Sequence, residues 1–239
     1  MTIRELLPQF LHLVAIDLIS LIVYLKLAIL ASIMESLLLP IFYIVVILYS
    51  VTIHEVSHGL MANSLGDNTA KNLGRLSLNP IKHIDLFGSV LLPLFLFFTT
   101  GFVFGYAKPV PYNPNNLVDR KYGPAKVAIA GPLSNFTLAL LFGLTLRFAP
   151  DLFISPMVFE LFSYIVLLNL VLGIFNLFPV PPLDGHWLLM TFLPPRMNSL
   201  KVYIYKNSFI LFPIFLVVFI VFVSPIIYWF FRLITGTGL

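Results

Sequence analysis

The 239-residue chain has no cysteine and few charged residues. Without cysteine it can form no disulfide bond, no thiolate zinc site and no cysteine nucleophile. Charged side chains make up only 10% of the residues, against roughly 25% in ordinary soluble domains, whereas hydrophobic residues make up 59%. This composition predicts a polytopic membrane protein and excludes an ordinary soluble enzyme.

Basic residues outnumber acidic ones by 14 to 10, which gives a net charge of +4. They are spread among the loops between apolar stretches and form no dense cluster. We therefore interpret them as topology signals and not as a surface for nucleic acid. The lipid bilayer is the expected environment, and no sequence feature specifies an oligomeric state.

Long apolar stretches predict an all-α fold of about five to six transmembrane helices. The first, at residues 10–31, would be about 33 Å long as a helix, enough to cross the hydrocarbon core. The other candidates are residues 34–64, 125–148, 156–178 and 208–231. We expect one membrane-embedded domain over residues 1–239, with a catalytic core at about 36–193 and flanking helices at 10–31 and 208–231.

Residues 86–106 are also apolar, but they predict a re-entrant or irregular segment. Basic residues flank this stretch at positions 71, 75 and 82 and again at 108, 120, 121 and 126, so a simple crossing would place positive loops on opposite sides of the membrane. Glycine and proline interrupt it, and such backbone is tolerated at membrane depth where it packs on protein or lines a water-filled cavity. With this element, residues 54–64 and the loop at 179–207 lie on the cytoplasmic side.

The sequence His54-Glu55-Val56-Ser57-His58 directly follows an apolar run. Residues i and i+4 share one face of a helix, so the two imidazoles can bind one metal ion. Glu55 then points to the side, where it can reach a metal-bound water, as in zinc metalloproteases. The alternative is a buried pair of histidines in a helix bundle. Because residues 37–53 carry no charged side chain, polar groups after them are costly unless paired or metal-bound.

A catalytic zinc ion has three protein ligands and one open position, so a third ligand is needed. Asp184 is the first candidate, because three prolines at 179–182 break the preceding helix and direct its carboxylate. Its alternative role is the N-cap of the following helix, and capping does not exclude ligation. His186 is the second candidate. His83 is read as a loop histidine, with a role in supporting the ligands or facing the substrate as the alternative.

Two asparagines, Asn135 and Asn176, lie in apolar helices. Their commonest use in membranes is a hydrogen bond between helices. The alternative is catalytic, as donors to an oxyanion that develops during the reaction.

Together these motifs resemble the site-2 protease family, peptidase family M50, of intramembrane zinc metalloproteases. The likeness rests on His54 to His58, Gly131 to Asn135 and Asn176 to Gly185, in that order. Residues 66–68, 78–85 and 105–114 look like the short prokaryotic members. The likeness covers roughly residues 47–193, and the chain departs from many members because no stretch is long enough for an inserted PDZ or CBS domain.

The resemblance implies one Zn²⁺ ion held by His54, His58 and Asp184, with Glu55 as the general base. It also implies that Asn176 helps to hold the substrate backbone or the oxyanion. The expected partner is a transmembrane protein or peptide substrate, cleaved in or near its transmembrane segment. The expected location is a prokaryotic plasma membrane, with the active site toward the cytoplasm.

Two other functions compete with proteolysis: a metal-binding membrane transporter, and a metal-bound scaffold without catalysis. A transporter would also bury His and Asp among its spans. It would gain little from Glu55 beside the first histidine, and it usually shows polar positions along a path, whereas here they converge at one depth.

Overall fold

The structure is a computed structural model that describes residues 3–101, 103, 105–149 and 155–237, with side chains from residue 20 onward except at positions 31 and 35. This described part consists of helices joined by turns and loops, without a β-strand. Four helical segments in it are long and apolar enough to cross a membrane: Ser20–Ser64, Gly123–Phe148, Pro156–Asn176 and Ser208–Thr235. The predicted all-α membrane fold is therefore confirmed.

The first helix, α1 (Ile3–Ser64), contains the boundary between two compact units, which falls between Val45 and Val46. In the first unit, the described side chains are exposed or half-buried and almost all apolar, as expected of a helix covered by lipid. The sequence predicted two spans here, 10–31 and 34–64, but the helix has no end between them. The physical reason is that residues 31–39 contain neither glycine nor proline, so nothing local breaks the helix.

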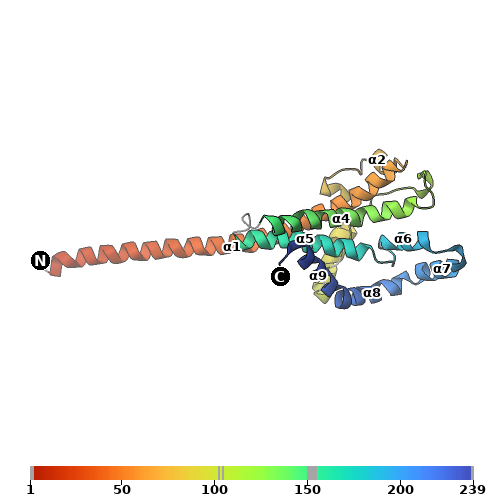
Figure 1. Cartoon of the computed structure of the whole chain (residues 1–239). Helices are drawn as coiled ribbons and strands as arrows, with labels where there is room; N and C mark the ends of the chain where they lie inside the picture. Colours follow the sequence, from red (N-terminus) through yellow and green to blue (C-terminus); the bar gives the residue numbers. More distant parts are fainter. Residues whose placement is uncertain (1–2, 102, 104, 150–154, 238–239) are drawn as a thin grey trace. The chain divides into compact units, whose positions relative to one another are not determined.

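The second unit starts with the last part of α1 and is built around α4 (Gly123–Phe148), α5 (Pro156–Asn176) and α9 (Ser224–Thr235). In Figure 1, α4 lies along α5, and α9 packs against both. Each of these three helices has a proline in its first turn, where the missing N–H costs no hydrogen bond. Their shared core includes Ala139, Val166, Leu170 and Phe231.

Shorter helices complete the second unit. α2 (Thr69–Asn72) follows α1, α6 (Gly185–Phe192) follows the turn after α5, and α7 (Asn198–Lys206) leads into α8 (Ser208–Val218). A π-helical turn, η6 (Phe219–Val223), joins α8 to α9. Short 3-10 turns lie at Pro80–His83 (η1), Pro114–Asn116 (η3) and Pro195–Met197 (η5).

The segment after residue 85 folds back on itself. It consists of the π-helix η2 (Leu86–Leu91) and α3 (Leu92–Thr100), together about 22 Å long, which is short of the roughly 30 Å hydrocarbon core. The chain then returns to its start, because the Tyr106 N–H donates to the Gly88 carbonyl at 3.0 Å and the Ser89 hydroxyl donates to the Tyr106 carbonyl at 2.9 Å. An irregular segment that folds back on itself is therefore present where the sequence predicted one.

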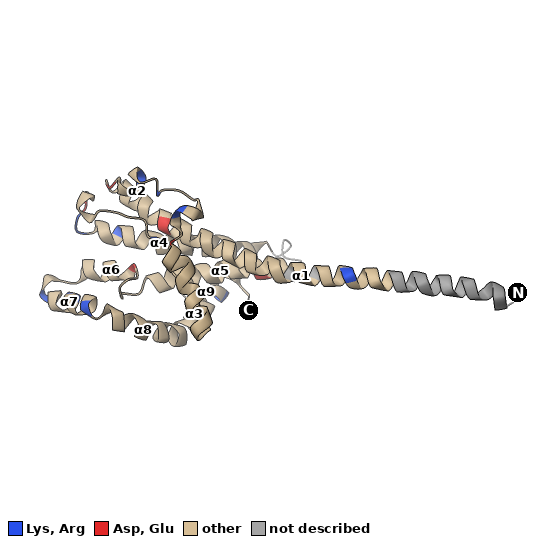
Figure 2. Cartoon of the chain, turned by 180° about the vertical axis from the view of Figure 1, so that it is seen from behind, with Lys and Arg blue, Asp and Glu red and all other residues tan. Residues whose placement is uncertain are grey.

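Most lysine and arginine residues of the second unit lie at the end that carries α2, the start of α4, and α7 (Figure 2). Residues 71–126 contain seven of the 14 basic residues, and residues 196–206 contain three more. A concentration of positive charge in loops at one end of a helical bundle is the pattern expected of the cytoplasmic side.

Two adjacent phenylalanines on α9 test the packing of the second unit. Phe231 is 0% exposed, whereas Phe230 is 37% exposed. Phe231→Ala should lower the free energy of unfolding by about 3–5 kcal/mol, because it leaves a cavity in the core. Phe230→Ala should cost less than about 1 kcal/mol. Unfolding of both variants in mild detergent measures the difference, and equal losses would contradict the described core.

The turn-back at residues 86–106 can be tested by labelling, since the native chain has no cysteine. Single cysteines at the exposed positions Lys82 and Asn115 should react from the same side of the membrane. A cysteine at Thr237, beyond the last candidate span, should react from the other side. Labelling of Lys82 and Asn115 positions from opposite sides would mean that this segment crosses the membrane.

Candidate metal centre

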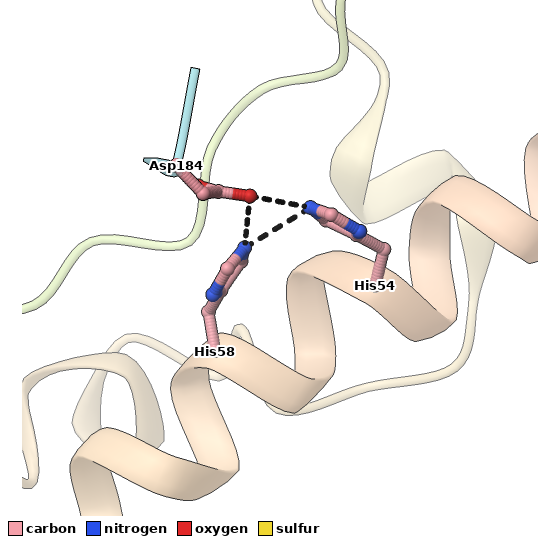
Figure 3. Close-up of side chains that lie close together, drawn as sticks. All are labelled: His54, His58 and Asp184. Carbon is pink, nitrogen blue, oxygen red and sulfur yellow. Dashed lines mark hydrogen bonds and ion pairs between the residues drawn. The ribbon is translucent and has the colours of Figure 1, made fainter. Parts of the chain in front are cut away.

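His54, His58 and Asp184 form a compact cluster in the second unit (Figure 3). The two histidines lie one turn apart on α1, and Asp184 immediately precedes α6. Asp184 Oδ2 lies 3.0 Å from His54 Nε2 and 3.2 Å from His58 Nε2, and the two nitrogens are 3.1 Å apart. Three potential ligand atoms are therefore close enough together to bind one metal ion.

The hydrogen bonds on the far side of each ring decide which nitrogen faces the cluster. Nδ1–H of His54 donates to Oδ1 of Asn135 at 2.5 Å, and Nδ1–H of His58 donates to the Val127 carbonyl at 2.7 Å. In the neutral imidazole the other nitrogen, Nε2, then carries a lone pair. Two such lone pairs and a carboxylate oxygen repel one another at these distances unless a cation lies among them.

These separations suit a tetrahedral zinc site. Ligand atoms at about 2.0–2.1 Å from zinc would be about 3.3 Å apart at the corners of a tetrahedron. The observed separations of 3.0–3.2 Å are slightly shorter. The donor set of two imidazole nitrogens and one carboxylate oxygen is also one that zinc accepts in hydrolytic sites.

Gly131 keeps the space in front of the two histidines open. It lies on α4, and a Cβ atom built on it would contact Nε2 of both His54 and His58. Any side chain at this position would therefore occupy the room that an ion or a reacting molecule needs. The histidines themselves are buried, at 6% and 8% exposure.

Asp184 is directed at the cluster by the turn between α5 and α6. α5 ends at Asn176, and the prolines that follow cannot continue its hydrogen bonding. Asp184 stands at the N-cap position of α6, but its side chain makes no capping hydrogen bond there. Burial alone would raise the pKa of Asp184. When Nε2 of the histidines carries a proton in place of a metal ion, the hydrogen bonds from His54 and His58 outweigh burial and hold that pKa well below the usual range. The Asp184 side chain is thus an ionised carboxylate that faces the two histidines and does not cap α6.

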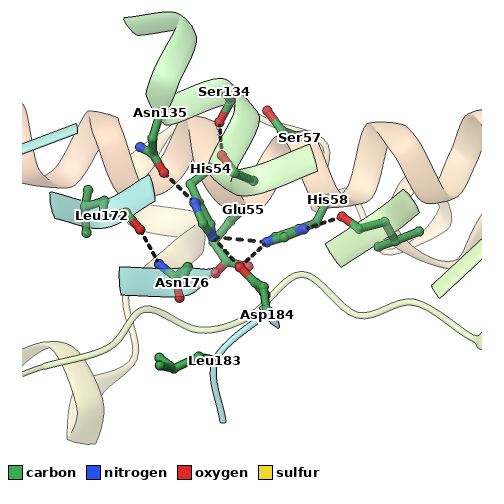
Figure 4. Close-up of polar contacts among 12 residues, drawn as sticks. His54, Glu55, Ser57, His58, Ser134, Asn135, Leu172, Asn176, Leu183 and Asp184 are labelled. Atoms are coloured by element: carbon green, nitrogen blue, oxygen red, sulfur yellow. Dashed lines mark hydrogen bonds and ion pairs between the residues drawn. The ribbon is translucent and has the colours of Figure 1, made fainter. Parts of the chain in front are cut away.

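The Asn135 side chain holds the His54 ring from behind (Figure 4), and it belongs to a buried polar network. The amide of Asn135 on α4 donates to Asn169 Oδ1 on α5 at 2.9 Å. Asn169 in turn donates to the Ser50 hydroxyl on α1 at 3.0 Å. Both asparagines are 0% exposed. The network therefore ties three helices together and fixes the orientation of His54.

Glu55 lies beside the cluster, on the same turn of α1 (Figure 4). Its Oε2 accepts a hydrogen bond of 2.8 Å from the Val110 N–H, in the extended chain that follows the turn-back segment. The side chain therefore has a fixed direction and is not one of the three clustered ligands.

Comparison with known proteins gives the family. Residues 153–220, which include Asn176 and Asp184, match the family described as Peptidase family M50. "Putative zinc metalloprotease YwhC" of Bacillus subtilis is 36% identical over 194 residues, which cover 79% of this chain and 84% of the relative. The chain belongs to peptidase family M50. "Putative zinc metalloprotease Rip2" of Mycolicibacterium smegmatis is 30% identical over 192 residues, 78% of this chain and 69% of that relative. No solved structure matches the chain.

The other candidate residues of this M50 peptidase lie outside the cluster. The Asn176 amide donates to the Leu172 carbonyl of its own helix at 3.0 Å, and Figure 4 shows its side chain on the Asp184 side of the centre. His186 donates from Nδ1 to the Leu183 carbonyl at 2.5 Å. His83 is buried in its loop, where Nε2–H donates to the Ser77 carbonyl at 2.8 Å.

Asn169 is the residue of the centre that motif reasoning did not single out. Its signal in the sequence is weak, because it is one of two asparagines in a mostly apolar helix. The role of the Val127 carbonyl as the acceptor for His58 cannot be identified from the sequence, since every residue has a backbone carbonyl. Both become visible only when α4 and α5 are placed against α1.

The network predicts a difference between two asparagines. Asn135→Ala removes the acceptor for His54 Nδ1–H, so metal affinity should fall about 10- to 100-fold. Asn176→Ala is the matched control, since its amide is bonded within its own helix, and it should leave the affinity within about twofold of wild type. Competition with a chromophoric zinc chelator measures both. Equal loss in the two variants would contradict a specific role for Asn135.

Proposed function

We propose that this M50 peptidase is an intramembrane zinc metalloendopeptidase that hydrolyses peptide bonds in or near transmembrane segments of membrane proteins. The observation that carries the proposal is the convergence of His54 Nε2, His58 Nε2 and Asp184 Oδ2 within 3.2 Å of one another. The two relatives named as zinc metalloproteases support zinc as the ion.

In this proposal His54, His58 and Asp184 hold one Zn²⁺ ion and leave a fourth position open. Zinc bound there would acidify a water molecule and polarise the carbonyl of the peptide bond. The protein fixes both imidazoles through their Nδ1–H bonds to Asn135 and to the Val127 carbonyl. Gly131 leaves room for the substrate in front of the two nitrogens.

Glu55 is the proposed general base. It follows His54 directly, and the Val110 N–H directs its carboxylate beside the cluster. Glu55 takes a proton from the attacking water and delivers it to the leaving amine, so that one side chain serves as base and then as acid. This transfer contributes typically 10²- to 10⁴-fold to a rate.

The two asparagines differ in their proposed roles. Asn135 is occupied by His54, Asn169 and the Ser50 carbonyl, which supports a positioning role in place of the oxyanion donor considered from the sequence. Asn176 lies on the Asp184 side of the centre (Figure 4), which is compatible with holding the backbone of a substrate. We keep that role for Asn176.

The substrate is a membrane protein that offers an extended stretch of backbone, because a peptide bond within an intact helix is shielded by its own turns. The apolar helices place the enzyme in a lipid bilayer. The basic loops around α2 and α7 support a cytoplasmic orientation of the centre. The bacterial relatives support a prokaryotic plasma membrane.

The decisive experiment compares wild type with Glu55→Gln, using purified protein, a transmembrane model substrate and zinc analysis. Glu55→Gln should retain zinc, since Glu55 is not a ligand, but lose at least about 10²-fold in cleavage rate. Glu160→Gln, the same change at an exposed position on α5, is the matched control and should cleave as wild type does.

Two further results complete this test. Asp184→Ala should lose most of its zinc, because two imidazoles remain as the protein ligands. Cleavage that survives Glu55→Gln would refute the proposed mechanism. Zinc held at full affinity by Asp184→Ala would refute the ligand assignment, and zinc binding without cleavage by the wild type would favour a transporter or a scaffold.

A further inference from the structure

The segment at residues 108–117, termed the proline strap, ends in the η3 turn and is bonded to the end of α1 and to the loop that follows it. Prolines at positions 109, 111 and 114 remove three backbone donors, since proline has no N–H. Between residues 109 and 114, the remaining N–H groups belong to Val110, Tyr112 and Asn113. Two of these three bind carboxylates: Val110 donates to Glu55 at 2.8 Å, and Asn113 donates to Asp67 at 2.6 Å.

Asp67 is a buried carboxylate with an unusually complete set of donors. It lies three residues beyond the end of α1 and is 0% exposed. Besides Asn113, it accepts hydrogen bonds from the Thr69 N–H at 3.2 Å, the Thr69 hydroxyl at 2.5 Å and the Asn116 side-chain amide at 2.9 Å. An ionised group is buried at an acceptable cost only when it is bonded in this way.

The same bonds set the charge state of Asp67. Burial by itself would raise the pKa of Asp67, but the hydrogen bonds from Thr69, Asn116 and Asn113 outweigh burial and lower that pKa. Two of these donors, Asn113 and Asn116, belong to the proline strap, so the carboxylate fastens the strap to the end of α1.

Close packing at Gly59 shows that the strap also lies tightly against α1 near the Glu55 carboxylate. Gly59 is one turn beyond Glu55, and a Cβ atom built on it would lie 2.8 Å from Val110 Cγ1 and 2.5 Å from Leu76 Cδ2. Val110 itself is only 6% exposed. The distance between the Val110 amide and Glu55 therefore depends on how firmly the strap is held.

We propose that Asp67 is a positioning residue for catalysis: it anchors the proline strap and thereby holds the Val110 N–H against Glu55. The inference rests on the proposed role of Glu55 as the base. The metal ligands are held separately, by Asn135, by the Val127 carbonyl and by the turn before α6. Loosening the strap should therefore misdirect the base while leaving the metal centre intact.

The test uses the full-length, zinc-loaded enzyme with Asp67→Asn, which replaces one acceptor oxygen by a donor at nearly constant volume. We expect kcat to fall about 10- to 100-fold, as for a catalytic group displaced by about 1 Å, with KM within about twofold and zinc content unchanged. Asp119→Asn is the matched control. Asp119 also accepts two backbone N–H bonds and one side-chain bond, but from Lys121, Tyr122 and Lys126, outside the strap.

A cysteine at Val110 reports on the strap directly, because the native chain has no cysteine and Val110 is buried. Maleimide should label Val110→Cys slowly, and faster once Asp67→Asn is added. The positioning role would be overturned if Asp67→Asn kept the wild-type kcat, or if it lost zinc together with activity. It would also be overturned if Asp67→Asn left the labelling rate of Val110→Cys unchanged. If Asp67→Asn does not fold, Asn116→Ala, which removes one strap bond to Asp67, is judged by the same criteria with a smaller fall in kcat.

This test separates the inference from the proposed function. If Glu55→Gln abolishes cleavage and Asp67→Asn does not impair it, only the role of Asp67 fails. If Glu55→Gln cleaves normally, the base assignment fails, and with it the reason for expecting a catalytic effect at Asp67.

Discussion

Repulsion among lone pairs is the constraint on which the rest of the centre depends. Two imidazole nitrogens and one carboxylate oxygen lie 3.0–3.2 Å apart, and the outer nitrogen of each ring is already committed as a donor. Such an arrangement is stable when a cation occupies it. The surrounding protein therefore has to keep three acceptors together and supply donors and acceptors behind them, which explains the polar network buried among apolar helices.

Three polar residues on three helices form the network behind His54. Ser50, Asn135 and Asn169 each come from a different helix, and each is hydrogen-bonded to another helix of the same group. Buried amides cost free energy when unpaired, but paired ones specify one way of packing the helices. The network that orients His54 thus also sets the register of α1, α4 and α5. The geometry of the candidate metal centre and the packing of the helices therefore depend on the same hydrogen bonds.

Much of this was predictable because it depends on local spacing. The i, i+4 pair His54 and His58 must share a helix face, and the prolines before Asp184 must end α5. The basic residues on both sides of 86–106, with the glycines and prolines within it, were enough to predict an irregular segment there. The continuity of α1 was not foreseen, since apolar composition alone does not say where a long helix stops.

What escaped prediction depends on contacts between distant segments. The Asn169 amide and the Val127 carbonyl acquire their roles only when α4 and α5 lie against α1. The proline strap is similar: the sequence shows where N–H groups are missing, but not that those left at Val110 and Asn113 meet Glu55 and Asp67. Motifs identify residues that carry chemistry, whereas the backbone groups that hold those residues are identified by the fold.

The separation of the clustered residues along the chain has a consequence for biosynthesis. Asp184 follows His54 by 130 positions, with α4 and α5 between them. A ribosome therefore makes the two histidines and Glu55 long before the third proposed ligand emerges. A nascent chain inserted only as far as α4 therefore lacks the third member of the cluster, and the cluster can form only after α5 and the turn that follows it have been made.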